Sequence, residues 1–466
     1  MQLYSTLSRR LEELLTDTVR MYVCGPTVYD LIHIGNARPF IVFDALRRYL
    51  ESQGKKVIHV QNITDVDDKI INRAREEGVP PSQVAARYTE EYFRDLEGLG
   101  VNPPTHSPKA TEYVPKMVEF IEKLVEKGHA YVVEGDVYFS VATFPEYGKL
   151  SGKVLEELEA GARIAVDEKK RDPLDFALWK AGRPGEPKWP SPWGEGRPGW
   201  HTECVVMAMD ILGVPLDIHA GGNDLIFPHH ENEIAQAEAA TGEEFARIWL
   251  HNGMLTVRGE KMAKSLGNFS YARDVVAEYG TEAVRYFYLS RAYRKPLDFS
   301  EAALREAKRA VEGVYGFLWE AEALPEEGEI PEAFSLELSS LEEKFHARLS
   351  DDFDTAGAIG ALQEIVGAAH RLRQAGGGPT GLRAAAALLR RLAQPLGLFQ
   401  TAPPQAKGLA EELIQLLVEL RAALRRERNF ALADHIRTRL AELGVELRDG
   451  PEGTIWLLRG RNQKAG

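Results

Sequence analysis

Cysteine is scarce in this chain, because only Cys24 and Cys204 occur among its 466 residues. A framework of several disulfides is therefore excluded. Three states stay open for the pair: one disulfide, two buried inert thiols, or two thiolates that bind one metal.

Long apolar runs are lacking as well. No stretch approaches the roughly 18 consecutive apolar residues that a membrane helix needs. The N-terminal residues are charged and have no apolar centre of the kind found in a secretory signal. We therefore expect a cytoplasmic protein without membrane attachment.

Positive charge is in the minority. The formal net charge is −13 at pH 7, which argues against a protein that coats nucleic acid indiscriminately. A specific contact with RNA through a local basic surface stays open. The length and the 44% hydrophobic content allow large cores, divided among about two to four domains.

What the sequence does contain is an alternation of strands and helices. Apolar, β-branched runs predict strands at residues 19–23 and 57–60, and helical periodicity follows each of them, over residues 40–50 and 65–77. Such alternation is typical of a parallel, doubly wound sheet with its ligand at the carboxyl edge of the strands. The sequence therefore predicts an α/β fold of the Rossmann-like type.

Further elements are expected along the chain. The patterns predict helices over residues 113–127, 200–212, 340–373, 382–396 and 409–443, a strand over 216–219, and hairpins over 130–141, 251–259 and 445–458. Residues 180–199 are too rich in Gly, Pro and Trp for regular structure, so they are expected to form a long functional or boundary loop.

The segment Pro228-His229-His230-Glu231-Asn232-Glu233 is dense in possible metal ligands. Pro228 suits a first helical turn, and residues four apart share one helix face, so His229 and Glu233 could form half of a Zn²⁺ site. A polar helix start with one packed histidine is the alternative. Cys24 ends the first strand and Cys204 lies on a predicted helix, and this placement favours all four converging on one Zn²⁺.

Two other segments could bind phosphate. His33-Ile34-Gly35-Asn36 lies where a strand leads into a helix, a place where helix N–H groups can face an anion. Gly35 would let adenine approach the backbone, and His33 and Asn36 could donate to phosphate. Lys261 and Lys264, on a loop next to Gly267, could bind a triphosphate, although an ordinary surface loop would look the same.

Together these motifs resemble the cysteinyl-tRNA synthetase family of class I aminoacyl-tRNA synthetases, over almost the whole chain. Residues 33–36 match its HIGH signature and residues 261–265 its KMSKS signature. Residues 22–30, 62–69, 199–201 and 227–233 also resemble the family. Asn36 replaces the last His of HIGH and Ala263 the middle Ser of KMSKS; neither change removes a charge, so we expect an active enzyme.

The resemblance implies ligation of L-cysteine to tRNA(Cys) through a cysteinyl-adenylate. ATP would be a substrate, accompanied by Mg²⁺. His33, Gly35, Asn36 and Lys264 would contact ATP, and Lys261 and Lys264 would neutralise the departing pyrophosphate. One Zn²⁺, bound by Cys24, Cys204, His229 and Glu233, would select the substrate thiolate. The residues that would line the cysteine pocket are Cys24, Gly25, Thr64, Trp200 and Asp224.

The resemblance also implies how the chain is divided. A Rossmann-like catalytic domain would be followed by a helical bundle and a small C-terminal α+β domain that binds the anticodon. The expected parts are residues 1–114 and 196–252 (catalytic domain), 115–195 (insertion), 253–320 (KMSKS region), 321–397 (bundle) and 405–466 (anticodon-binding domain). A monomer is expected. Two alternatives stay open: a cysteine ligase acting on a small amine, as in mycothiol synthesis, and a catalytically inactive RNA-binding protein.

Overall fold

The computed structural model describes residues 1–152, 169–262, 267–402, 406–450 and 453–458. The chain forms two compact units, residues 1–400 and residues 401–466, and each is described by itself. Within the described ranges, no helix is both long enough and apolar enough to cross a membrane.

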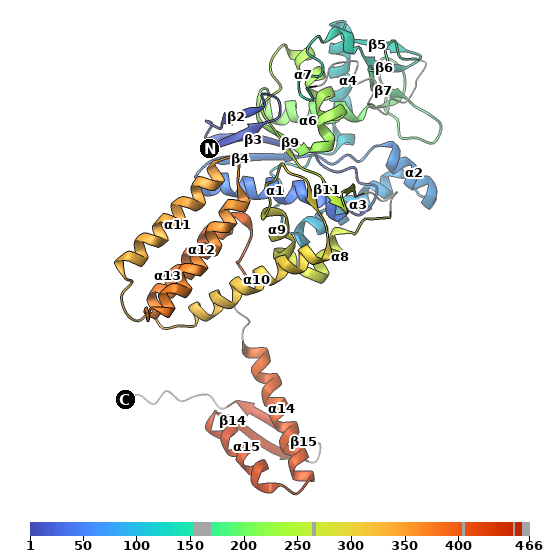
Figure 1. Ribbon diagram of the computed structural model, residues 1–466. Helices are drawn as coiled ribbons and strands as arrows, with labels where there is room; N and C mark the ends of the chain where they lie inside the picture. The colour runs from blue at the N-terminus through green and yellow to red at the C-terminus, as the bar shows by residue number, and fades with distance from the viewer. Residues whose placement is uncertain (153–168, 263–266, 403–405, 451–452, 459–466) are drawn as a thin grey trace. The chain divides into compact units, whose positions relative to one another are not determined.

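A four-stranded parallel sheet forms the centre of the first unit (Figure 1). Its strands, in spatial order, are β10 (Ala246–Asn252), β9 (Leu216–Gly222), β3 (Thr18–Val23) and β4 (Lys56–Gln61). The strands predicted at residues 19–23, 57–60 and 216–219 are confirmed, each slightly longer than predicted.

Helices cover both faces of this sheet. Because alternate side chains of a strand point to opposite faces, Met21 and Val23 pack in the core that contains α1 (Ile34–Ser52), whereas Tyr22 packs with α6 (Trp200–Leu212). Helix α7 (Glu231–Thr241) lies on the same side as α6 (Figure 1). The predicted doubly wound α/β fold is therefore confirmed.

The hairpin predicted over residues 251–259 is wrong in its first part. Residues 251 and 252 belong to β10 of the parallel sheet, and the hairpin is formed by β11 (Leu255–Val257) and β12 (Glu260–Lys261). β10 is buried along almost its whole length, so its sequence lacks the alternation that marks a half-exposed strand. β13 (Leu297–Asp298) pairs with β11 in parallel.

Between β4 and α6 the chain forms helices and a second, antiparallel sheet. These elements are α2 (Asp68–Glu77), α3 (Pro81–Gly98), α4 (Ala110–Glu126), β5 (Ala130–Val133), β6 (Asp136–Phe139), β7 (Phe176–Ala181) and β8 (Gly196–Pro198). The prediction that residues 180–199 lack regular structure is wrong at both ends, which belong to β7 and β8. The two strands pair because fully buried Trp179 lies opposite Pro198.

The remaining elements of the first unit lie at its start and after β12. A short hairpin is formed by β1 (Gln2–Ser5) and β2 (Arg10–Glu13). The helices are α8 (Ala272–Tyr279), α9 (Thr281–Leu289), α10 (Glu301–Glu322), α11 (Glu332–Ser350), α12 (Thr355–Gln374) and α13 (Pro379–Ala393). The pattern over residues 340–373 misses the break between α11 and α12, where Asp352 and Phe353 have positive φ angles.

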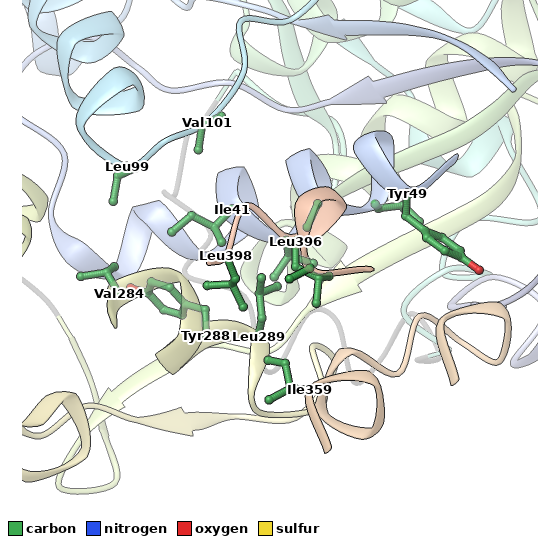
Figure 2. Close-up of a cluster of buried hydrophobic side chains, with 14 of the residues drawn as sticks. Ile41, Tyr49, Leu99, Val101, Val284, Tyr288, Leu289, Ile359, Leu396 and Leu398 are labelled. Carbon is green, nitrogen blue, oxygen red and sulfur yellow. The ribbon is translucent and has the colours of Figure 1, made fainter. Parts of the chain in front are cut away.

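One continuous core joins the bundle to the central sheet. Figure 2 shows Ile41 and Tyr49 of α1 in one buried cluster with Tyr288 and Leu289 of α9 and with Leu396 from the segment after α13. All of these side chains are almost completely buried. Helix α1 therefore packs against α9 and against residues 394–399.

The second unit consists of two helices and a hairpin. Its elements are α14 (Ala406–Arg426), α15 (Phe430–Glu442), β14 (Val445–Gly450) and β15 (Gly453–Leu458). The terminal hairpin is confirmed, but the helix predicted over residues 409–443 is two helices, with Asn429 as the N-cap of the second. Buried Arg421 binds both carboxylate oxygens of Asp449 at 2.8 Å and ties α14 to the hairpin.

Candidate active site

A cavity of about 540 Å³ lies at the carboxyl ends of β3, β9 and β10. Its walls are the loop after β3, the first turns of α1, the loop after β9 and the residues that follow β10. Lys69, Trp200 and Met262 complete it. This is the edge of the sheet at which the sequence places the ligand.

Four candidate metal ligands meet at one end of this cavity. Cys24 Sγ lies 4.0 Å from Cys204 Sγ and 3.6 Å from Glu233 Oε1, and His229 Nε2 lies 2.8 Å from the same carboxylate oxygen. All four residues are buried, and one donor atom from each lies within 4.8 Å of the other three. Two sulfurs, a nitrogen and a carboxylate oxygen therefore form a candidate metal site.

The local geometry that brings His229 to Glu233 differs from the prediction. Residues Ile226–His230 form a wide π-helical turn with a non-helical residue at Phe227, and the α-helix begins only at Glu231. Pro228 therefore precedes the α-helix instead of occupying its first turn. His229 and Glu233 still face each other, because the chain is helical from His229 onward.

Neighbouring charges set the protonation of this cluster. Burial alone would favour a neutral carboxyl, but His219 and His229 hold the pKa of Glu233 well below its usual range. Against the effect of burial, Glu233 and Cys204 raise the pKa of His229 to about 10. The hydrogen bond with Cys24 lowers the pKa of Cys204 to about 6. A carboxylate and one thiolate are thus favoured at neutral pH. Burial and the neighbouring Cys204 raise the pKa of Cys24, so Cys24 and His229 would each lose a proton when a metal binds.

A second set of donors overlaps the first. Cys24, His219, His230 and Glu233 also place their donor atoms within 4.8 Å of one another. His230 Nε2 lies 3.1 Å from Cys24 Sγ, and His219 Nε2 lies 2.7 Å from Glu233 Oε2. Cys24 and Glu233 are thus common to both sets, and the histidines lie on either side of them.

Neighbouring side chains contact His229 and His230 through hydrogen bonds and ring stacking. The Nδ1 atoms of His229 and His201 are 2.9 Å apart, and the ring of Trp200 stacks on that of His229 with centroids 4.1 Å apart. His230 Nδ1 is hydrogen-bonded to His251 Nε2, and His251 Nδ1 is hydrogen-bonded to the Thr6 hydroxyl. Second partners of this kind fix the tautomer and orientation of a metal-binding imidazole.

The sequence offers only partial signals for these supporting residues. His219 is the last residue of the predicted strand over 216–219, and His251 lies in β10, which the pattern misses. A polar residue inside a buried strand was the available signal, because such a group needs a partner. Their contact with the cluster depends on the sheet order, which no local pattern contains.

At the other end of the cavity is the N-terminus of α1. His33 is the N-cap residue, and its backbone N–H donates to Asn36 Oδ1 at 3.3 Å. His33, Gly35 and Asn36 all line the cavity. A Cβ on Gly35 would lie 2.9 Å from His33 Nδ1, so any larger residue would displace the His33 ring.

The KMSKS segment begins and ends beside this helix terminus. Lys261 is the last residue of β12, and Met262 lines the cavity. Residues 263–266, and therefore Lys264 and Ala263, lie outside the described residues. Downstream, Tyr271 forms a β-bridge with His33, and Ile34 N–H donates to Ser270 O at 2.8 Å. The described residues on both sides of this gap, Met262 and Tyr271, therefore lie beside the segment that begins α1.

The residues predicted to line the cysteine pocket divide into two groups. Gly25, Trp200 and Asp224 line the cavity, as does Cys24. A Cβ on Gly25 would lie 1.6 Å from Asn62 O, so no other residue fits there. Thr64 is buried, and its hydroxyl donates to Glu203 at 3.0 Å and accepts from Asn62 at 3.1 Å. Direct contact of Thr64 with a substrate stays a prediction.

Comparisons with known proteins cover nearly the whole chain. Residues 10–309 match the family model described as tRNA synthetases class I (C) catalytic domain, and residues 344–400 match the DALR domain. The chain is 49% identical to the cysteine–tRNA ligase of Pseudothermotoga lettingae, over 98% of this chain and 99% of that protein. It is 51% identical to the cysteine–tRNA ligase of Alkalilimnicola ehrlichii, over 96% of each.

Solved structures share the fold at low sequence identity. The chain resembles the Mycobacterium tuberculosis methionyl-tRNA synthetase in complex with methionyl-adenylate, with a TM-score of 0.64 and 17% identity over 85% of this chain and 94% of that one. It also resembles the LeuRS–tRNA–LeuAMS complex from Agrobacterium radiobacter K84, with a TM-score of 0.61 and 14% identity over 81% and 83% of the two chains.

Proposed function

This chain belongs to the cysteine–tRNA ligase family of class I aminoacyl-tRNA synthetases, and we propose that it joins L-cysteine to tRNA(Cys) in two steps. In the first, the cysteine carboxylate attacks the α-phosphate of ATP, forming cysteinyl-adenylate and releasing pyrophosphate. In the second, a hydroxyl of the terminal adenosine of the tRNA attacks the activated carbonyl, and AMP leaves. The single observation that carries the proposal is identity of about half over nearly the full length of named relatives.

Cys24, Cys204, His229 and Glu233 are proposed to hold one Zn²⁺. Two thiolates, an imidazole and a carboxylate are the donor types that zinc binds. Tetrahedral zinc places its ligand atoms roughly 3.3–3.8 Å apart, close to the 3.6 Å and 4.0 Å separations from Cys24. His229 Nε2 and Glu233 Oε1, now in an ion pair at 2.8 Å, would have to separate by about 0.5 Å to bind the ion. The ion would supply an affinity for thiolate that a serine hydroxyl cannot match.

Substrate cysteine is proposed to bind between Trp200 and Asp224, next to this cluster. Both residues line the cavity, and Asp224 is an exposed carboxylate that suits the α-ammonium group of an amino acid. Gly25 lines the same cavity and lets the loop after β3 approach the Asn62 backbone closely. Thr64 is proposed to support this wall through Asn62, whose side chain accepts from Gly25 N–H at 2.8 Å.

ATP is proposed to occupy the end of the cavity at α1. His33 and Asn36 would donate to its phosphates, and the helix N-terminus adds a favourable partial charge. Lys261 and Lys264 would neutralise the charge that grows on the departing pyrophosphate, and Mg²⁺ would accompany ATP. Positioning and charge stabilisation are thus what this chain contributes to the first step.

The C-terminal residues 405–466 are proposed to bind the anticodon region of the tRNA. Exposed Arg425 and Arg437 lie around Asp449 within this unit and offer cations to RNA phosphates. The division of residues 1–397 into catalytic, insertion, KMSKS and bundle parts is proposed as predicted. A cytoplasmic monomer is proposed for the enzyme.

The test compares two acceptors, tRNA(Cys) and a small amine, with one protein preparation. Purified protein should catalyse cysteine-dependent exchange of pyrophosphate into ATP and should charge tRNA(Cys) with cysteine while rejecting serine by about 10⁴-fold. Exchange with cysteine, but transfer only to a small amine such as an amino sugar, would identify the amine ligase instead. Absence of exchange in a zinc-containing, folded preparation would indicate an inactive RNA-binding protein.

A further inference from the structure

Arg38, in the second turn of α1, is a buried cation behind two residues that line the cavity, Gly253 and Met254. Its side chain is fully buried. Within the described part of the chain, no carboxylate forms an ion pair with it. Burial lowers the pKa of Arg38 to about 10, so the guanidinium keeps its charge at neutral pH. A buried arginine is normally paired, and this exception needs a reason.

Two nitrogens of the guanidinium contact backbone carbonyls, whereas Nε is buried without a hydrogen-bond partner among the described residues. Nη1 donates to Gly253 O at 2.6 Å and to Met254 O at 3.2 Å, and Nη2 lies 3.4 Å from Ala292 O. Gly253 and Met254 line the cavity. A Cβ on Gly253 would lie 2.2 Å from Lys295 O, so this wall is held between Arg38 on one side and residues 295–296 on the other.

This wall is also the base of the KMSKS segment. Leu255, the next residue, begins β11, which pairs with β12 and so leads to Lys261. Met262 N–H returns to Leu255 O at 3.5 Å. Arg38 therefore links the helix that begins with HIGH to the hairpin that precedes KMSKS.

We propose that Arg38 is a positioning residue for ATP, which sets the distance between the two signature segments and places a permanent positive charge behind the phosphate end of the cavity. This inference rests on the proposed ATP site. The planar guanidinium can bind two carbonyls at once, which a lysine ammonium cannot do in the same geometry. The bound triphosphate would be the counter-charge that the protein itself does not supply.

The test uses two variants of the full chain and a matched control. Arg38→Lys keeps the positive charge but loses the planar group that binds two carbonyls at once, whereas Arg38→Met loses both. We expect the Kd for Mg-ATP, measured by calorimetry, to rise about tenfold in Arg38→Lys, equivalent to one lost charge-assisted hydrogen bond, and further in Arg38→Met. The KM for cysteine and the bound zinc should stay at wild-type values in Arg38→Lys.

Arg285→Lys is the control. Arg285 is equally buried and also donates to backbone carbonyls, including those of Leu396 and Gly100, but it pairs with Asp44, and neither of these two carbonyls belongs to a residue that lines the cavity. This variant should lower the Tm and leave the Kd for Mg-ATP unchanged.

Two results would overturn the proposal. One is an unchanged Kd for Mg-ATP in Arg38→Lys. The other is an equal weakening of ATP and cysteine binding in that variant, which would indicate a general distortion of the cavity. If Arg38→Met does not fold, Arg38→Lys decides alone. ATP binding is measured without turnover. If the wild type failed to charge tRNA(Cys), the proposed function would be refuted, but the Kd values for Mg-ATP would still test the role of Arg38.

Discussion

The two ends of the cavity are built in opposite ways. At the metal end, the four candidate ligands are at most 8% exposed, and each has further buried partners. At the ATP end, Asn36 is exposed and His33 only half-buried, and the helix N-terminus is open to the cavity. Buried charges are costly unless paired, so such a cluster is retained only where fixed donors are needed. Phosphates must enter and leave, which favours an accessible helix terminus and long lysine side chains.

The largest expected effect is at the metal end. Glu233→Ala should abolish zinc binding and lower cysteine-dependent pyrophosphate exchange by more than about 10³-fold, because it removes one ligand and leaves His219 and His229 without their carboxylate. Metal analysis and exchange assays on the same preparation provide the measurement.

The control for this variant is Glu231→Gln. Glu231 is equally buried and lies on the same helix, but its carboxylate accepts from the backbone N–H groups of Leu150 and Ser151, so zinc should remain bound. His230→Asn separates the two donor sets: retention of zinc supports the set with His229, whereas its loss would favour the set with His230. Exchange that survives complete zinc removal from the wild type would refute thiolate selection.

Lys264→Ala should have the next largest effect, at the ATP end. Loss of one cation that stabilises the departing pyrophosphate should lower the exchange rate by about 10²–10³-fold, with zinc content unchanged. Single-turnover formation of cysteinyl-adenylate is the direct measurement. Lys295→Ala, at an exposed lysine outside the cavity, should behave as the wild type. A near-normal exchange rate in Lys264→Ala would contradict the proposed role.

The same contrast explains which features the sequence predicts. The helix over residues 200–212 is predicted with its observed bounds, because Gly199 and Gly213 bracket a continuous apolar pattern. The convergence of the four metal ligands follows from strand ends and spacing. By contrast, the break near Asp352 depends on distant partners: its carboxylate accepts from Tyr4 N–H and Arg294. Local periodicity contains no information about these contacts.

The second donor set is missed for a related reason. His219 approaches Glu233 only because β9 lies beside β3 and α7 covers that face. The π-helical turn before Glu231 likewise has no signal in the sequence. A proline just before a helical pattern predicts the first turn of an α-helix, so Pro228 gives no indication of the irregular turn. Features that depend on sheet order or on backbone irregularity therefore require the structure, whereas the convergence of Cys24, Cys204, His229 and Glu233 does not.

The smallest expected effect is at Asn36, and it tests whether the ATP end tolerates change. Asn36 Oδ1 accepts a single, long hydrogen bond from His33 N–H, and its amide nitrogen can still donate to phosphate. Such a bond at an exposed position is worth about 0.5–1.5 kcal/mol, so Asn36→Ala should raise the KM for ATP roughly 3–10-fold in exchange assays. Asn36→His restores a donor and should remain within about threefold of the wild type. A loss above about 100-fold in Asn36→Ala, or any loss of zinc, would mean that the two ends of the cavity are not independent, because an exposed residue at one end would then control the buried cluster at the other.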